Sequence, residues 1–241
     1  MDWTIEQVTN KLQEVANKGF LAILSSMYRS DEGVVGQILE REFGVQENNL
    51  SLRDLGTFEL KAMRFNSKTL TLCHKTTSKG LTPLEIFDRF GYIKPSKRDP
   101  AVLKKKLFTT VKGNRANNHG FILHSGTDSS IDMFCKDEFI CQWELTEQLE
   151  KIDKIILTLA KTQGKVNSKA ESFHYVKADI YDSLKNLSSL VNEGTIVIDF
   201  CIDQPVGSNR SPHDRGPHIR IPKSKLPRAY NNITPLLDSN L

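Results

Sequence analysis

The sequence predicts an α/β fold in which helices flank a mixed sheet. Near the N-terminus, apolar residues recur every three or four positions, which is typical of amphipathic helices. Further along the chain, short segments either alternate polar and apolar residues or are continuously apolar, which is typical of half-buried and fully buried strands. With 241 residues, the chain can form one large domain or two lobes.

Two helices are expected in the first 44 residues. Thr4 and Gln7 have the spacing of a capping box at the start of the first helix. Asp31 is expected to cap the second helix, which Gly44 ends. Glu40 lies in this second helix, next to its apolar stripe, and periodicity alone places it at the helix edge.

The segment 54–61 reads as a turn followed by a strand. Glu59 and Lys61 share one face of that strand because side chains alternate, and Asp54 lies just before it, next to a glycine that allows a tight turn. Two carboxylates can bind a hard divalent cation, and a lysine beside them can orient water or offset phosphate charge. The alternative is an amphipathic strand with a solvated charged face.

A strand is expected over residues 69–75, and a helix starts at Thr82 and Pro83 and ends near Gly91. His74 shares one face of that strand with Leu70 and Leu72, a position that is typical of an interior histidine.

Strands and one helix account for most of the remaining regular structure. Three short strands are expected over residues 120–143, and a continuous apolar run at 155–159 indicates a buried strand. Another strand is expected at 173–177, then a helix over 182–192 and an apolar strand over 196–202.

Positive charge is concentrated in two segments, although the formal net charge is only +4. Residues 94–115 and 207–228 each contain at least six basic residues and one acidic residue. This clustering indicates a cationic surface for a polyanion, and the alternative is a pair of solvated loops. The first segment supplies candidate phosphate contacts at Lys104, Lys105, Lys106, Lys112 and Arg115.

The second basic segment also contains an unusual density of hydrogen-bonding side chains. Arginine can bind guanine O6 and N7, aspartate can accept from cytosine N4, and histidine can donate or accept. The alternative is a polar turn with an internal ion pair. The candidate base contacts are His213, Asp214, Arg215, His218 and Arg220.

Other function classes are disfavoured by what the sequence lacks. It has no glycine-rich nucleotide-binding motif, no H-E-x-x-H and no G-x-S-x-G. Its four cysteines have no C-x-x-C spacing, so free thiols and a cytoplasmic location are expected. No apolar run approaches the ~20 residues of a membrane span, and the N-terminus does not resemble a secretory signal.

Four of these residues together resemble the metal-binding core of PD-(D/E)xK nucleases, namely Glu40, Asp54, Glu59 and Lys61. Longer segments, including 33–41, 104–110 and 212–218, resemble BcnI-like type II restriction endonucleases, in the branch related to MvaI and MutH. The resemblance covers nearly the whole chain. The proline of the general PD motif is absent, since Arg53 precedes Asp54, and this departure fits the BcnI-like pattern.

This resemblance implies a restriction-endonuclease-like α/β fold with two lobes around a DNA cleft. Residues 1–241 would form a single nuclease domain, with a catalytic core at about 1–92 and DNA-recognition elements at about 93–119 and 205–228. Mg²⁺ would be bound by Asp54, Glu59 and the Leu60 carbonyl. Lys61 would position the attacking water. Glu40, which periodicity alone placed at the helix edge, would instead lie in the active site and support the metal or its water shell.

The resemblance also implies a substrate. His74 and His218 would lie at the central base pair of double-stranded DNA of sequence CC/SGG, where S is C or G, and Asp214, Arg215 and Arg220 would read the flanking C·G pairs. The enzyme would be a cytoplasmic monomer with no membrane partner and with a cognate DNA methyltransferase. The alternatives are a MutH-like strand-nicking mismatch-repair endonuclease and a DNA-binding module with an inactive core.

Overall fold

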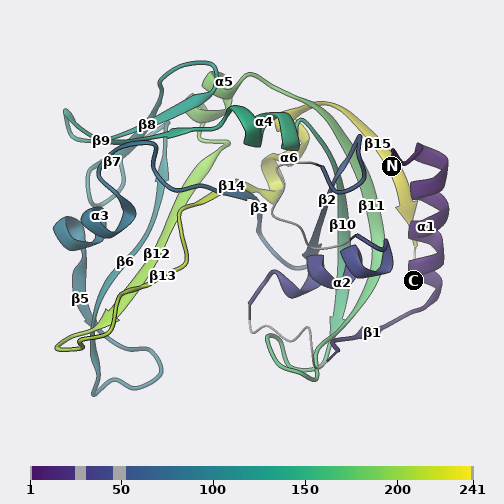
Figure 1. Ribbon diagram of the computed structural model, residues 1–241, viewed down its shortest axis with the longest axis horizontal. Helices are drawn as coiled ribbons and strands as arrows, with labels where there is room; N and C mark the ends of the chain where they lie inside the picture. Colours follow the sequence, from purple (N-terminus) through teal and green to yellow (C-terminus); the bar gives the residue numbers. More distant parts are fainter. Residues whose placement is uncertain (1, 25–30, 46–52, 240–241) are drawn as a thin grey trace. The chain divides into compact units, whose positions relative to one another are not determined.

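The computed structural model describes residues 2–24, 31–45 and 53–239, which form two compact units (Figure 1). Unit 1 contains Met1–Lys68, Glu147–Leu184 and Tyr230–Leu241, and unit 2 contains Thr69–Thr146 and Lys185–Ala229. The chain therefore leaves unit 1 for unit 2 twice. The functional ranges 1–92, 93–119 and 205–228 stay predictions, because a division by compactness does not test them.

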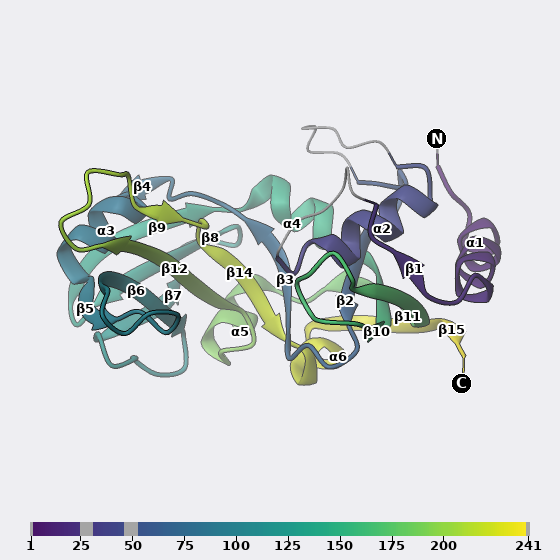
Figure 2. The same cartoon turned by 90° about the horizontal axis from the view of Figure 1, so that it is seen from below.

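Unit 1 is built on a mixed five-stranded sheet. Its order is β1-β11-β10-β2, and β15 also pairs with β11. The long strands β10 and β11 run antiparallel side by side, whereas β2 pairs with β10 in parallel (Figure 1, Figure 2). The strands are β1 (Leu21–Ala22), β2 (Glu59–Arg64), β10 (Lys154–Gln163), β11 (Ser172–Leu184) and β15 (Tyr230–Asp238).

Helices α1 (Ile5–Asn17) and α2 (Val34–Glu42) pack on one face of this sheet. Leu12 and Ile38 from the helices share a buried cluster with Leu60 of β2. Residues 59 and 61 therefore project from the opposite face of β2. A third helix, α4 (Thr146–Ile152), immediately precedes β10.

The prediction for the start of α1 is confirmed, and the prediction for the start of α2 is wrong. The capping box of Thr4 and Gln7 is confirmed, with both reciprocal hydrogen bonds present. The prediction that Asp31 caps α2 is wrong, because the cap position belongs to Gly33. Asp31 Oδ1 instead accepts from the Gly33 N–H at 2.8 Å, so its side chain holds the turn before the helix.

Unit 2 contains a six-stranded and a four-stranded sheet. The first has the order β3-β14-β12-β6-β5, with β13 beside β12, and the second has the order β4-β9-β8-β7. The first sheet comprises β3 (Thr69–His74), β5 (Tyr92–Pro95), β6 (Leu103–Lys112), β12 (Val197–Pro205), β13 (His213–Asp214) and β14 (His218–Pro222). The remaining elements are β4 (Lys79–Gly80), β7 (Phe121–Ser125), β8 (Ser130–Cys135), β9 (Glu138–Glu144), α3 (Pro83–Phe90), α5 (Leu187–Asn192), η2 (Lys223–Lys225) and α6 (Leu226–Ala229).

The six-stranded sheet has an apolar and a polar face. Ile198, Phe200 and Ile202 of β12 are buried, and the Phe200 ring lies 6.1 Å from that of Trp143 in the four-stranded sheet. Alternation places Asp199 and Cys201 on the other face, which we call the outer face. On the outer face, Asp199 lies opposite Thr110 of β6 and His218 of β14. His218 in turn lies opposite His74 of β3.

The helix expected over residues 182–192 is correct only in its second half. Strand β11 continues through Leu184, because its residues up to that point pair with β15. Helix α5 then begins at Leu187, where the Asn186 side chain accepts from the N–H groups of Ser188 and Ser189. The amide side chain of Asn186 thus sets the start of the helix.

Candidate functional site

The turn before β2 brings an aspartate to the start of the strand. Gly56 has a φ of +73°, a left-handed conformation that favours glycine. Asp54 Oδ2 accepts a hydrogen bond from the Leu60 N–H at 3.0 Å. The carboxylate of Asp54 is therefore fixed beside the first two residues of β2.

Glu59 is the most buried member of this site. Its side chain is 4% exposed, and Oε1 lies 2.6 Å from Nζ of Lys61. Its second oxygen, Oε2, lies 3.3 Å from Nζ of Lys151 on α4. The sequence analysis did not identify Lys151. No local pattern marks this residue, and the whole segment Thr69–Thr146 of unit 2 separates it from Glu59 in the sequence.

The two carboxylates repel each other electrostatically. Burial raises the pKa of Asp54, and the neighbouring charge of Glu59 raises it further, although the Leu60 N–H and two lysines oppose this shift. Glu59 Oε2 is buried and has no hydrogen-bond partner among the described residues. The Glu59 oxygen lacks a hydrogen bond, and the ionised form of the Asp54 carboxylate is unfavourable. A divalent cation, which prefers oxygen ligands, would stabilise both groups.

Glu40 lies on α2, half-buried, with its carboxylate over Gly36 of the same helix. Helix α2 covers the Leu60 face of β2, opposite to the face of Glu59 and Lys61. Within the described ranges, no group of three or more His, Cys, Asp or Glu side chains is arranged to hold a metal ion. The structure thus brings together Asp54, Glu59 and Lys61, and a role for Glu40 stays a prediction.

Three lysines of the first basic segment make contacts within the protein. Lys104 Nζ lies 2.6 Å from Asp203 Oδ1. Lys105 Nζ donates to the Asp88 carbonyl at 3.0 Å, and the 8% exposed Lys106 donates to the Pro95 carbonyl at 2.8 Å. These contacts join β6 to β12, to α3 and to β5, so a run of lysines in the sequence is not a run of free charges.

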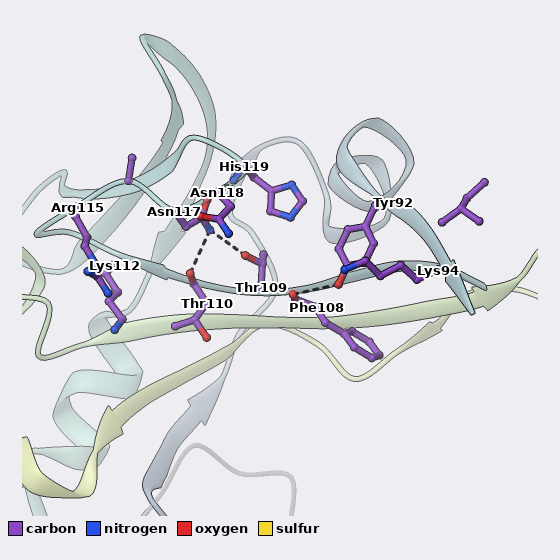
Figure 3. A pocket seen from close by; sticks show the side chains of 12 residues that line it. Tyr92, Lys94, Phe108, Thr109, Thr110, Lys112, Arg115, Asn117, Asn118 and His119 are labelled. Atoms are coloured by element: carbon purple, nitrogen blue, oxygen red, sulfur yellow. Dashed lines mark hydrogen bonds between the residues drawn. The ribbon is translucent and has the colours of Figure 1, made fainter. Parts of the chain in front are cut away.

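The other two predicted phosphate contacts line a cavity of about 830 Å³ (Figure 3). Lys112 and Arg115 lie at one end, and Tyr92 with Lys94 lies at the other (Figure 3). None of the described residues that line this cavity is acidic. A lining that contains Lys94, Lys112 and Arg115 but no acidic side chain suits an anionic ligand.

Histidines from two neighbouring strands meet on the outer face. The His74 and His218 rings are 4.3 Å apart at an interplanar angle of 65°. His74 is exposed, so its interpretation as an interior histidine is wrong. His218 is 9% exposed, and its Nδ1 has no hydrogen-bond partner in the described part of the chain.

An acid next to this pair was not predicted. Asp199 Oδ2 accepts from Nη1 of Arg220 at 3.0 Å, and its Oδ1 accepts from the Thr110 hydroxyl. Arg220 Nε is buried and has no partner among the described residues. One signal could have identified Asp199, since it interrupts an apolar strand at a position that must face outward.

The remaining predicted base contacts lie beside β12. His213 pairs with Asp203 in the ladder of β13 and β12. The Asp214 carboxylate accepts from the Gly216 N–H at 2.8 Å, and the Arg215 N–H donates to the Cys201 carbonyl. The turn is thus held by the backbone and by Asp214.

Comparison with known proteins identifies the family. The sequence model of the MvaI/BcnI restriction endonuclease family matches residues 9–230. The chain belongs to this family. It is a type II restriction endonuclease, a site-specific DNA nuclease, as the sequence resemblance implied.

Two solved structures are similar to this endonuclease over its whole length. The complex of restriction endonuclease MvaI with its cognate DNA substrate has a TM-score of 0.75 and 21% identity, covering 98% of this chain and 100% of that chain. MvaI in the absence of DNA has a TM-score of 0.51 and 20% identity, covering 98% and 99%. These matches confirm the restriction-endonuclease-like α/β fold. Comparison with curated proteins found no match.

None of the helices that the structure describes has the length and apolar character needed to cross a bilayer. The four cysteines of the endonuclease are free thiols, as expected.

The endonuclease should lose stability in acid because of His218. Burial lowers the pKa of His218 from 6.5 to about 4, and the nearby His74 and Arg220 act in the same direction. Between these two values the unfolded state binds a proton that the folded state does not, so stability falls as the pH drops from 6.5 towards 4. Urea unfolding across this range should show a weaker pH dependence in His218→Gln than in wild type. Identical pH dependence in both would contradict the lowered pKa.

Proposed function

We propose that this endonuclease hydrolyses double-stranded DNA with Mg²⁺ at the short pseudo-palindromic site CC/SGG. It acts as a monomer beside a cognate methyltransferase, as the family resemblance implies. The observation that carries the catalytic part is the convergence of Asp54, Glu59 and Lys61 at the start of β2.

Asp54 and Glu59 would hold the cation, with help from the Leu60 carbonyl. The fit rests on the buried Oε2 of Glu59, which makes an ion pair with Lys151 but no hydrogen bond, and on the raised pKa of Asp54. A bound divalent cation would stabilise both carboxylates. A bound divalent cation polarises the phosphoryl group and lowers the pKa of water.

The other side chains of the site act on water and charge. Lys61 donates to Glu59 and would orient the attacking water, while its charge offsets the negative charge that builds up on the phosphate. Glu40 would support the water shell of the metal. Lys112 and Arg115 would hold DNA phosphates, because they line a cavity without acids.

The outer face would read the bases. An uncharged imidazole can donate from one nitrogen and accept at the other, so each histidine of the His74–His218 pair suits either guanine or cytosine. That property suits S at the central position, and the preference for S over A or T rests on the family resemblance. Arg220, Arg215 and Asp214 would read the flanking C·G pairs.

Digestion of a plasmid of known sequence tests this function. With Mg²⁺ and no partner protein, the ends should map to CCSGG sites and to no CCWGG site, where W is A or T. Ends at CCWGG would overturn the assignment of the central pair. Nicking of one strand at hemimethylated sites only would favour the MutH-like alternative.

Arg220→Ala should weaken base discrimination by about 1–3 kcal/mol, because a guanine-specific donor is lost. The measurement is the ratio of cleavage rates on CCSGG and on single-mismatch duplexes. Arg210→Ala is the control, since Arg210 is exposed in the same unit and its hydrogen bond to Gln204 uses only its carbonyl. Equal losses on all duplexes would instead identify Arg220 as a phosphate contact.

A further inference from the structure

Two lysines form ion pairs with the buried carboxylate of Glu59, one with each oxygen. Lys61 Nζ lies 2.6 Å from Oε1, and Lys151 Nζ lies 3.3 Å from Oε2. The side chains of the two lysines are only 22% and 28% exposed, so neither is a freely solvated surface charge. Lys61 is the family lysine on β2, but Lys151 comes from α4, a different part of the sequence.

Arg53 fixes α4 next to the catalytic turn. Its guanidinium donates to the Glu150 carbonyl, the residue before Lys151, through both Nε and Nη2. The same group donates to the Thr57 carbonyl at 2.8 Å through Nη1. Arg53 thus connects the last turn of α4 to the turn that carries Asp54. It occupies the position at which PD-(D/E)xK nucleases have proline, which could not make this connection.

We propose that Lys151 is a second active-site lysine that occupies the Oε2 oxygen of Glu59 until a divalent cation takes that oxygen, with Arg53 as the residue that positions it. This inference rests on the proposed metal-dependent function. Lys151 and the cation compete for one oxygen atom. Once displaced, the ammonium group stays beside the site because Arg53 holds α4, and its charge is then available to the DNA phosphate.

Removal of the Lys151 charge should therefore have opposite effects on two quantities. The cation should bind more tightly, because no ammonium group has to leave Oε2 and one repulsive positive charge is gone. Cleavage with saturating metal should be slower, because a positive charge near the phosphate is lost. Removal of a lysine with a purely structural role would not combine tighter cation binding with slower cleavage.

The test uses calorimetric titration of Mg²⁺ and Mn²⁺ into the full-length enzyme without DNA. Lys151→Met should bind both ions at least about tenfold more tightly than wild type. At saturating Mg²⁺, kcat should fall at least about tenfold with KM for DNA unchanged, and Lys151→Arg should restore part of kcat. Arg53→Met should shift both quantities in the same directions.

Lys154→Met is the matched control. Lys154 is three residues further along, is 25% exposed and pairs with Asp182 at 3.2 Å instead of Glu59, so its removal changes the net charge equally. It should bind metal as wild type does. Unchanged or weaker metal binding in Lys151→Met would overturn the inference. A wild-type enzyme that neither binds the ions nor cuts DNA would instead overturn the proposed function.

Discussion

Asp54→Asn should reduce DNA cleavage by at least about a thousandfold while the protein stays folded and still binds DNA. Asparagine keeps the shape of the side chain and an oxygen that can accept from the Leu60 N–H. It removes the negative charge that a divalent cation needs, and with it the charge stabilisation that dominates phosphoryl transfer. Single-turnover cleavage of a duplex and fluorescence anisotropy without metal separate these two effects.

The same substitution should not destabilise the enzyme. Burial and the charge of Glu59 raise the pKa of Asp54, so the ionised carboxylate is unfavourable in the folded state. An uncharged side chain relieves that penalty, and a catalytic residue that costs stability is a common feature of active sites. The midpoint of thermal unfolding of Asp54→Asn should equal or exceed that of wild type.

Asp153→Asn provides the control for both measurements. Asp153 lies in the same unit and also accepts a backbone hydrogen bond, from the Leu184 N–H at 3.0 Å. Its loss of charge should leave cleavage close to the wild-type rate. If Asp54→Asn cleaved as fast as Asp153→Asn, the assignment of the metal site would be wrong.

Glu171→Gln should destabilise the enzyme by about 3–5 kcal/mol, because it breaks a buried ion pair. Glu171 is 0% exposed and accepts two hydrogen bonds from Arg64, at 2.7 and 2.8 Å. Burial alone would raise the pKa of Glu171, but Arg64 and the Asn167 N–H outweigh it and lower the pKa. Without the carboxylate, the Arg64 charge is left buried at the end of β2.

An exposed pair with similar geometry tests whether burial causes this effect. Arg89 and Glu138 also form two hydrogen bonds, both of 2.6 Å, but their side chains are 47% and 52% exposed. Glu138→Gln should cost only about 0–1 kcal/mol, because water screens the pair. Urea unfolding compares the two variants, and the double substitution Arg64→Met with Glu171→Met should recover much of the loss. Equal costs for Glu171→Gln and Glu138→Gln would contradict this account.

Local patterns in the sequence were sufficient for much of the fold. The capping box at Thr4 involves residues three positions apart, and it is present. The helix start predicted at Thr82 and Pro83 is also present. Alternation correctly predicted the strand that begins at Glu59, because the side-chain period of a strand is a property of the backbone. Asp31 misled the prediction, since an aspartate can bind the backbone of a turn as readily as that of a helix.

The chemistry of charged groups was less predictable, because it depends on partners that are distant in sequence. Lys104 has its partner on β12, and Lys106 has its partner at the last residue of β5, so neither is free as the basic segment suggested. Lys151 joins Glu59 only because β10 pairs with β2. Asp54, Glu59 and Lys61 were predictable because one turn and one strand contain all three.

The parallel pairing of β2 with β10 has a consequence for protein synthesis. Glu59 pairs with Ile155, and β2 has no other strand partner among the described residues, so β2 cannot join a sheet before β10 has left the ribosome. At about 5–20 residues per second, the residues between them take roughly 5–20 s to make. The nascent chain therefore contains both carboxylates for seconds before it can hold them in place. A nuclease assembled in this order cannot form its catalytic strand pairing until β10 has been synthesised.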